Sequence, residues 1–209
     1  MLTKLLLIGA GGHAKVVTDA VYTMAPDCQI FIRDQDPCKM GKILINSIKI
    51  ELLQNWSDLP EKYHVCIGNN HHRRTLDLTA RTQGKQPYTV IHSEAYVSPY
   101  AQIAPGCFIA AKSVVSAGVR MTEGCIINHS AIVDHDCKIG AFTHIAPNVT
   151  LGGGVEIGAG SLIGASATVL PGIKLGANVV IGAGAVILSD VPDNQKVVGV
   201  PGRYIGINE

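Results

Sequence analysis

The second half of the chain carries an aliphatic residue at every sixth position. From Ile91 to Ile187, all seventeen positions reached in steps of six are Ile, Val, Leu or Met. This spacing matches neither an amphipathic helix nor an alternating strand. Hexapeptide repeats form a parallel β-helix in which three hexads make one triangular coil. The pattern therefore predicts a prism of five to six stacked coils, filled by one aliphatic column.

Two further features of the hexad support a narrow prism. Glycine often follows the aliphatic residue, as at Gly140 and Gly158, and we expect it there because a corner needs backbone freedom. Three of the six cysteines fall in the repeat and are expected to pack rather than react. Small or β-branched residues stand four positions after the aliphatic one, at Ala95, Ala101, Cys107, Ser113, Val119, Cys125, Ala131, Cys137 and Thr143.

The first part of the chain lacks the repeat, and its hydrophobic pattern is typical of alternating strands and helices. It predicts strands at 4–8, 29–33, 43–50 and 63–67 and helices at 14–24 and 71–83. We therefore expect a Rossmann-like domain over residues 1–88 with a mostly parallel sheet. Residues 89–209 are expected to form the β-helix, ending in an irregular tail after Ile187.

Composition and charge exclude several classes of function. The 209 residues include 23 glycines, only 5% are aromatic, and the net charge is +1. A nearly neutral chain has no bulk field to hold nucleic acid or an anionic membrane. The apolar run Leu5–Ile8 is far shorter than a signal-peptide core, so we expect a cytoplasmic protein without membrane insertion.

A glycine-rich turn follows the first predicted strand. The spacing Gly9-x-Gly11-x-x-Ala14 would present backbone N–H groups at a helix start, which suits a phosphate, and His13 could donate to it. Asp34 ends the next strand, where a ribose-binding acid would stand. The alternative is that the glycines only allow a tight strand-to-helix turn.

Histidines mark a second candidate site, within the repeat. His129 and His135 occupy equivalent positions in consecutive hexads, and His144 follows nine residues later. Asp134 and Asp136 flank His135, and neighbouring carboxylates raise the basicity of an imidazole, as a general base requires. The alternative is a solvated polar edge. No spacing brings three imidazoles together, so we expect no metal site.

The quoted residues together resemble a known family. The hexads, Leu7–Ala14, Ile67–Asn70, Thr89–Ser93, the block from Asn128 to Cys137 and the closing Gly199–Gly202 are similar to the left-handed β-helix sugar acyltransferases of the sialic acid O-acetyltransferase group. Within this group the chain most resembles bacterial UDP-4-amino-sugar N-acetyltransferases of the bacillosamine pathway.

The resemblance implies an activity and an assembly. The chain would be a homotrimer that transfers acetyl from acetyl-CoA to the 4-amino group of a UDP-linked amino-dideoxy sugar by direct attack. Acetyl-CoA would lie in the groove between adjacent prisms, and the small domain would hold the nucleotide sugar. The alternatives are O-acetylation of sialic acid or a related glycan and, less in keeping with the glycine turn, a non-catalytic scaffold or a zinc enzyme that hydrates CO₂.

The resemblance also implies roles for individual residues. His135 would be the general base and Asp136 its supporting acid. Substrate contacts would come from Gly11, Gly12 and His13 at the phosphates, Asp34 near the uridine and Asn128 at the sugar. Acetyl-CoA contacts would come from His144, Gly153, Ala165 and Ala183. Relatives often carry a second acid where this chain has Arg33.

Overall fold

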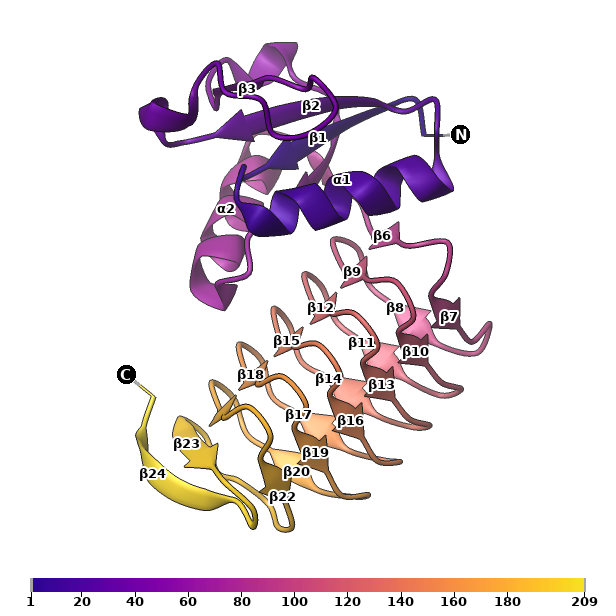
Figure 1. The fold of residues 1–209 in the computed structure, drawn as a ribbon, viewed down its shortest axis with the longest axis vertical. Coiled ribbons are helices and arrows are strands. Elements are labelled where there is room, and N and C mark those ends of the chain that lie inside the picture. Colours follow the sequence, from indigo (N-terminus) through magenta and orange to yellow (C-terminus); the bar gives the residue numbers. More distant parts are fainter. Residues whose placement is uncertain (1, 209) are drawn as a thin grey trace. The chain divides into compact units, whose positions relative to one another are not determined.

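A computed structural model describes residues 2–208 as two compact units (Figure 1). The first unit ends at Ser93, and the second begins at Glu94. The expected boundary after residue 88 marks where the six-residue repeat begins, whereas the boundary after Ser93 separates two compact units. The two boundaries describe different properties, so the first one stays a prediction. Each unit is described separately below.

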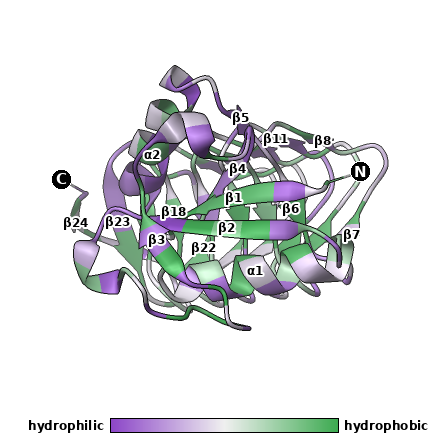
Figure 2. Ribbon diagram, turned by 90° about the horizontal axis from the view of Figure 1, so that it is seen from above, coloured by the Kyte–Doolittle hydropathy of each residue, from purple (hydrophilic) through white to green (hydrophobic). Residues whose placement is uncertain are grey.

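The first unit is built on a parallel sheet with the strand order β3-β2-β1-β4-β5. The middle parts of the neighbouring strands β1 and β2 are apolar, whereas their ends carry polar residues (Figure 2). Helix α2 packs against β4 and β5. No helix in the range 2–208 has the length and apolar character needed to cross a bilayer. The elements are β1 (Lys4–Ile8), α1 (Gly12–Met24), β2 (Gln29–Asp34), β3 (Ile50–Leu52), β4 (Lys62–Val65), α2 (Asn70–Thr82), β5 (Gln86–Pro87), β6 (Val90–Ile91) and two 3-10 turns (Pro37–Lys39 and Trp56–Asp58).

The strand predicted at 43–50 is wrong in its position. Ile43 instead pairs with Lys49 across a tight antiparallel bridge, and β3 begins only at Ile50. Asn46 and Ser47 both have positive φ, which marks a turn and not a strand. The apolar residues of this segment had suggested continuous pairing that the turn interrupts.

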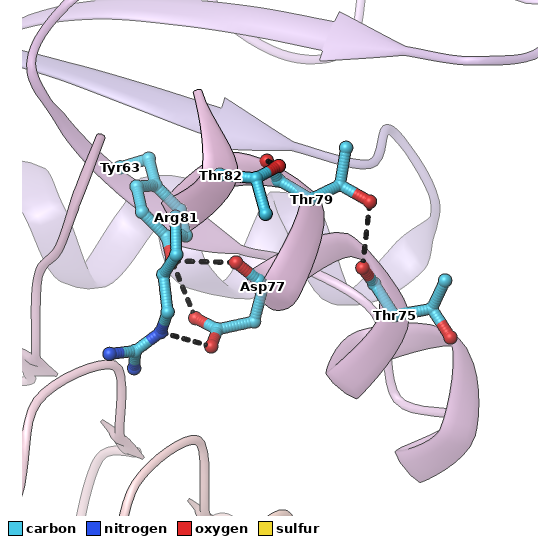
Figure 3. Close-up of polar contacts among 6 residues, drawn as sticks. All are labelled: Tyr63, Thr75, Asp77, Thr79, Arg81 and Thr82. Atoms are coloured by element: carbon cyan, nitrogen blue, oxygen red, sulfur yellow. Dashed lines mark hydrogen bonds and ion pairs between the residues drawn. The ribbon is translucent and has the colours of Figure 1, made fainter. Parts of the chain in front are cut away.

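A buried carboxylate ties α2 to β4. Asp77 accepts a hydrogen bond of 2.7 Å from the Tyr63 hydroxyl and one of 2.7 Å from Arg81 Nε, so both side chains meet on it (Figure 3). Asp77 is 4% exposed and Tyr63 only 1%. A carboxylate so buried is stable because both oxygens have donors.

The second unit is the predicted β-helix, and the fold class is confirmed (Figure 1). Its strands β7 to β22 are two residues long, and each of β7 to β19 pairs in parallel with the strand eighteen residues later, as Val115 pairs with Val133. The first face holds β7 (Tyr96–Val97), β10 (Val114–Val115), β13 (Ile132–Val133), β16 (Thr150–Leu151), β19 (Thr168–Val169) and β22 (Val186–Ile187). The second face holds β8 (Gln102–Ile103), β11 (Arg120–Met121), β14 (Lys138–Ile139), β17 (Glu156–Ile157) and β20 (Lys174–Leu175). The third face includes β9 (Phe108–Ile109), β12 (Ile126–Ile127), β15 (His144–Ile145), β18 (Leu162–Ile163) and β21 (Val180–Ile181).

The corners turn at a different residue from the one expected. Every sixth residue from Gly106 to Gly184 has a φ in the left-handed region, and it stands three positions after the aliphatic residue. Glycines directly after the aliphatic residue do not have such a φ. A Cβ on Gly140 would instead lie 2.5 Å from the backbone of Ala159 in the next coil. These glycines are therefore required by the close stacking of coils, and not by backbone freedom.

The C-terminal tail is ordered, which corrects the prediction of an irregular end. Strand β23 (Gln195–Val198) pairs in parallel with β21 and so continues the third face. Strand β24 (Arg203–Ile207) then pairs with β23 in the antiparallel sense. The break in the hexad pattern after Ile187 hid this pairing, because an antiparallel hairpin needs no six-residue register.

A buried histidine makes the first unit sensitive to acid. His64 on β4 is 1% exposed, and its Nδ1 lies 2.9 Å from the Tyr88 carbonyl oxygen. Burial lowers the pKa of His64 to about 4, while the Tyr88 hydrogen bond and Asp77 oppose this and the charge of Arg73 adds to it. The folded unit therefore holds His64 neutral at pH values where an unfolded histidine takes up a proton.

We predict that the first unit loses stability as the pH falls from 6.5 toward 4. The folded pKa lies below the unfolded value, so the unfolded chain binds more protons across this window, at a cost of about 3 kcal/mol of unfolding free energy. Fluorescence of Trp56, the single tryptophan, would report unfolding in urea at each pH. His64→Asn, whose amide can still donate to Tyr88, should flatten this dependence, whereas exposed His71→Gln should leave it. Equal slopes in both variants would contradict the assignment to His64.

Candidate functional site

The glycine turn after β1 is shaped by two different requirements. Gly9 has a φ of +100°, and a Cβ there would lie 2.8 Å from the Ile67 side chain, so only glycine fits. Gly11 and Gly12 are exposed, and a Cβ on either would meet open space. The first turn of α1 has no side-chain cap. The Ala14 amide donates to the Gly11 carbonyl oxygen at 3.1 Å, and the space beside Gly11 and Gly12, at the start of the helix, is open to an anion.

Asp34 holds this turn in place. Its Oδ2 accepts hydrogen bonds from the Ala10 amide at 2.7 Å and from Lys39 Nζ at 2.9 Å, while Oδ1 accepts from the Asp36 amide. Burial opposes ionisation of Asp34, but these hydrogen bonds outweigh it and lower the pKa of the carboxyl. Asp34 therefore stabilises the glycine turn through its hydrogen bond to Ala10. Lys39, which the sequence analysis did not single out, lies beside the same carboxylate.

The loop after β4 stands beside the glycine turn. From β1 the sheet continues to one side with β2 and β3 and to the other side with β4 and β5, so the direction of strand order reverses between β1 and β4. In open parallel sheets, ligands bind at the carboxyl ends of the strands at such a point. The buried Arg73 donates to the carbonyl oxygens of Ile67 and Gly68 at 3.0 Å and to the Asn70 side chain at 2.8 Å. Asn69 caps α2 by accepting from the His72 amide. These contacts fix the loop that joins β4 to α2.

The second candidate site is the corner that joins β13 to β14. Asp134, His135 and Asp136 form this corner, and Asp136 carries the left-handed φ of +60°. The amide of Asp136 donates to Ala117 in the preceding coil, and the His135 carbonyl accepts from Gly154 in the following one. The corner is therefore anchored by its backbone on both sides, which leaves its side chains free for chemistry.

Two carboxylates act on His135 in different ways. His135 Nδ1 lies 2.9 Å from Asp136 Oδ2, and the His135 amide donates to Asp134 Oδ1 at 2.8 Å. The hydrogen bond to Asp136, reinforced by the charge of Asp134, raises the pKa of His135 above its ordinary value. Because Nδ1 is engaged, the neutral ring presents its lone pair on Nε2.

Neighbouring coils leave room for this pair of side chains. A Cβ on Gly153 would lie 2.5 Å from His135 Nε2, and a Cβ on Gly118 would collide with the Asp136 carboxylate. The glycine one coil away on each side therefore leaves the space that these two side chains occupy, and a Cβ there would displace them. Gly153, expected near acetyl-CoA, thus lies directly against the imidazole.

A third group of side chains lies at the corner after β12. Asn128 Oδ1 accepts from the His129 amide and lies 2.9 Å from His129 Nδ1, while Asn128 Nδ2 lies 3.2 Å from His144 Nε2. Ala165 and Ala183 stand two and three coils after His129 in the same column of corners, and the Gly184 amide donates to the Ala165 carbonyl. The structure thus brings Asn128 and His144 together.

The second face carries a broad groove that lies apart from these histidines. It has a volume of about 830 Å³, and Arg120, Lys138, Glu156, Lys174 and Tyr204 are among the residues that line it. Lys138 pairs with Glu156 at 3.0 Å. Within residues 2–208 no group of three or more His, Cys, Asp or Glu side chains could hold a metal ion.

Family models match both parts of the chain. Residues 4–76 match the PglD N-terminal domain, and residues 154–189 match the bacterial transferase hexapeptide repeat. Comparison with curated protein sequences gave no match.

Solved structures match almost the whole chain. The acetyltransferase domain of PglB from Neisseria gonorrhoeae in complex with acetyl-coenzyme A is 35% identical, with a TM-score of 0.88, and the match covers 98% of this chain and 100% of that one. A histidine mutant of GDP-perosamine N-acetyltransferase from Caulobacter crescentus, in complex with CoA and GDP-perosamine, is 32% identical, with a TM-score of 0.91 and coverage of 99% and 98%. The resemblance seen in the sequence is confirmed: the chain belongs to the hexapeptide-repeat sugar acetyltransferases that carry a PglD-type N-terminal domain.

Proposed function

We propose that this protein transfers the acetyl group of acetyl-CoA to the 4-amino group of a UDP-linked amino-dideoxy sugar. The observation that carries the proposal is the His135–Asp136 pair, whose 2.9 Å contact prepares one imidazole as a base. Two of the matched structures support the substrate classes, since one contains acetyl-coenzyme A and the other contains CoA with a GDP-linked sugar.

His135 is the general base of this reaction. The sugar amine attacks the thioester carbonyl carbon, and His135 Nε2 takes the proton that the nitrogen loses as the C–N bond forms. The C–S bond then breaks, CoA leaves as a thiolate, and that thiolate takes the proton from the imidazolium. Asp136 orients the ring and stabilises its charged form. Backbone N–H groups in the groove between adjacent prisms of the trimer would stabilise the oxyanion.

Direct transfer of the acetyl group to the amine is consistent with the chemistry of Cys137, the cysteine that follows Asp136 in the sequence. Cys137 follows the dyad in sequence but is buried, and its Sγ donates to the Gly152 carbonyl oxygen at 3.3 Å. Burial raises the pKa of Cys137 to about 11, so the group is a thiol and not a nucleophilic thiolate near neutral pH. No acyl-cysteine intermediate at this position is needed.

The glycine turn is the proposed site of the nucleotide diphosphate. Gly11, Gly12 and His13 at the start of α1 would hold the phosphates, because the positive end of the helix dipole lies there, no side chain caps the helix, and the space beside Gly11 and Gly12 is open. Lys39 would add a positive charge at its rim. We assign Asp34 to support this turn and to stand near the uridine, since its oxygens already bind Ala10 and Lys39.

A homotrimer would complete the site. On the first face, the outward residue of each strand is uncharged: Tyr96, Val114, Ile132, Thr150, Thr168 and Val186. The second face instead carries Arg120, Lys138, Glu156 and Lys174. An uncharged face suits burial against a second copy, and the His135 corner directly follows it.

Acetyl-CoA would then run between two prisms beside the first face. Gly153 and the column of Ala165 and Ala183 border this face on opposite sides, and small residues let an extended arm approach the backbone. His144 would lie by the thioester, and Asn128 would stand where the sugar approaches it.

The choice of acceptor provides the direct test of the function. Purified protein with acetyl-CoA should release CoA thiol fastest with a UDP-linked 4-amino-dideoxy sugar, more slowly with GDP-perosamine, and not with free sialic acid. Faster turnover of GDP-perosamine would keep N-acetylation but overturn the uridine assignment. Turnover of sialic acid alone would overturn the proposal in favour of O-acetylation.

The pH dependence of catalysis should follow His135. Because a base must be unprotonated, kcat/KM should fall as the pH drops through the pKa of His135, which lies above 6.5. Asp136→Asn should move this acid limb to lower pH, since Asp136 is the main cause of the raised pKa. His135→Ala should lower kcat by roughly 10²–10⁴-fold without changing the assembly measured by light scattering. An acid limb unmoved by Asp136→Asn would point to another group.

Gly153→Ala should impair catalysis without unfolding the prism. The new methyl group would displace the imidazole, which is exposed and can swing aside, so kcat should fall at least about 10-fold while the melting temperature stays close to that of the wild type. Ala159→Ser adds one heavy atom at the matching position of the next corner and serves as the control. Unchanged turnover in Gly153→Ala would show that the observed ring position is not the reactive one.

A further inference from the structure

The amide of Asn128 joins two imidazoles from successive coils. Asn128 lies at the corner after β12, and its backbone amide donates to the Ile145 carbonyl oxygen at 2.9 Å. His144 belongs to β15, one coil later, and faces Asn128 on the same side of the prism. The contact is therefore set by the stacking register and not by a mobile loop.

The orientation of this amide is determined by a backbone group. The His129 amide N–H can only donate, and it lies 2.9 Å from the atom assigned as Asn128 Oδ1. The same oxygen lies 2.9 Å from His129 Nδ1, which must donate to it. The amide nitrogen therefore faces His144, because the alternative flip would place the Asn128 N–H₂ group against the backbone N–H of His129.

This orientation fixes the proton on His144. Asn128 Nδ2 can only donate, so His144 Nε2, 3.2 Å away, must accept with its lone pair. A neutral imidazole with an accepting Nε2 carries its proton on Nδ1. An imidazolium would turn an N–H toward the amide N–H₂, so this contact also disfavours a second proton on His144.

The two imidazoles are thus prepared for opposite tasks. His135 has a carboxylate at Nδ1, which stabilises its protonated form and leaves the lone pair of the neutral ring on Nε2. His144 has an amide donor at Nε2, which occupies that lone pair. A lone pair already engaged cannot accept a proton from an amine.

We propose that Asn128 is a positioning residue that sets the tautomer of His144, so that the neutral ring carries its proton on Nδ1 and turns its Nε2 lone pair to Asn128, while His135 exchanges the proton of the reaction. The inference rests on the proposed acetyl transfer for its role in catalysis, but the tautomer itself is a property of the protein without substrate. It gives Asn128 a task beyond contact with the sugar.

Asn128→Asp tests the tautomer with almost no change in shape. The carboxylate keeps an oxygen for the two His129 donors but presents an acceptor, not a donor, to His144. In the full-length protein labelled with ¹⁵N-histidine and free of substrates, two-bond ¹H–¹⁵N spectra should show His144 protonated on Nδ1 in the wild type and on Nε2 in Asn128→Asp. Asn148→Asp, an exposed position one coil on, introduces the same charge and should leave the His144 tautomer unchanged. Protonation of Nε2 in the wild type, or the same tautomer in wild type and Asn128→Asp, would overturn the proposal.

Steady-state kinetics separate positioning from substrate contact. If Asn128 acts through His144, Asn128→Asp should lower kcat by roughly 10²-fold, because the proton of His144 would move to the other ring nitrogen, with little change in KM for the amino sugar. A loss confined to KM for the amino sugar would overturn the positioning role. Because the spectra need no substrate, failure of the proposed acceptor would leave the tautomer test intact.

Discussion

The close stacking of coils is the constraint on which the rest of the second unit depends. Each aliphatic residue of the column lies over the one eighteen residues earlier, with backbone hydrogen bonds such as Val114 to Ala131 joining the coils. Successive coils approach so closely that a side chain on Gly158 would meet the backbone of Ala177. A prism packed in this way is filled, so every reactive side chain must stand on a corner or an outward face.

The corner geometry explains how a rigid repeat carries reactive groups. Backbone hydrogen bonds fix each corner to the coil before and after, and they do not depend on the side chains there. Glycine is the residue best suited to the left-handed position, yet Asp136 occupies it at φ +60°. Asp is among the residues that tolerate this conformation best, so the chain accepts a small local cost for a carboxylate beside His135.

Sequence patterns predicted what depends on period and chemistry, and failed where a contact with a distant segment decides. The hexads predicted the prism, its coils and the packing role of Cys137, because one residue in six repeats the same environment. The stacking role of Gly140 could not be seen, because it depends on Ala159 in the next coil. The hairpin of β23 and β24 follows no hexad, so it was missed. At the candidate site, His135 and Asp136 stood out as neighbours, but the orientation of Asn128 depends on His129 and His144 together.

The eighteen-residue register also limits how such a protein can change in evolution. Loss or gain of a single residue inside the prism would turn every later aliphatic side chain out of the column, whereas duplication of one whole coil would preserve all three faces. The prism can therefore lengthen or shorten only by whole coils of eighteen residues. A duplication placed after Ile163 would lengthen the prism without disturbing the Asn128 and His135 corners, so the chain could grow in reach while its chemistry stayed where it is.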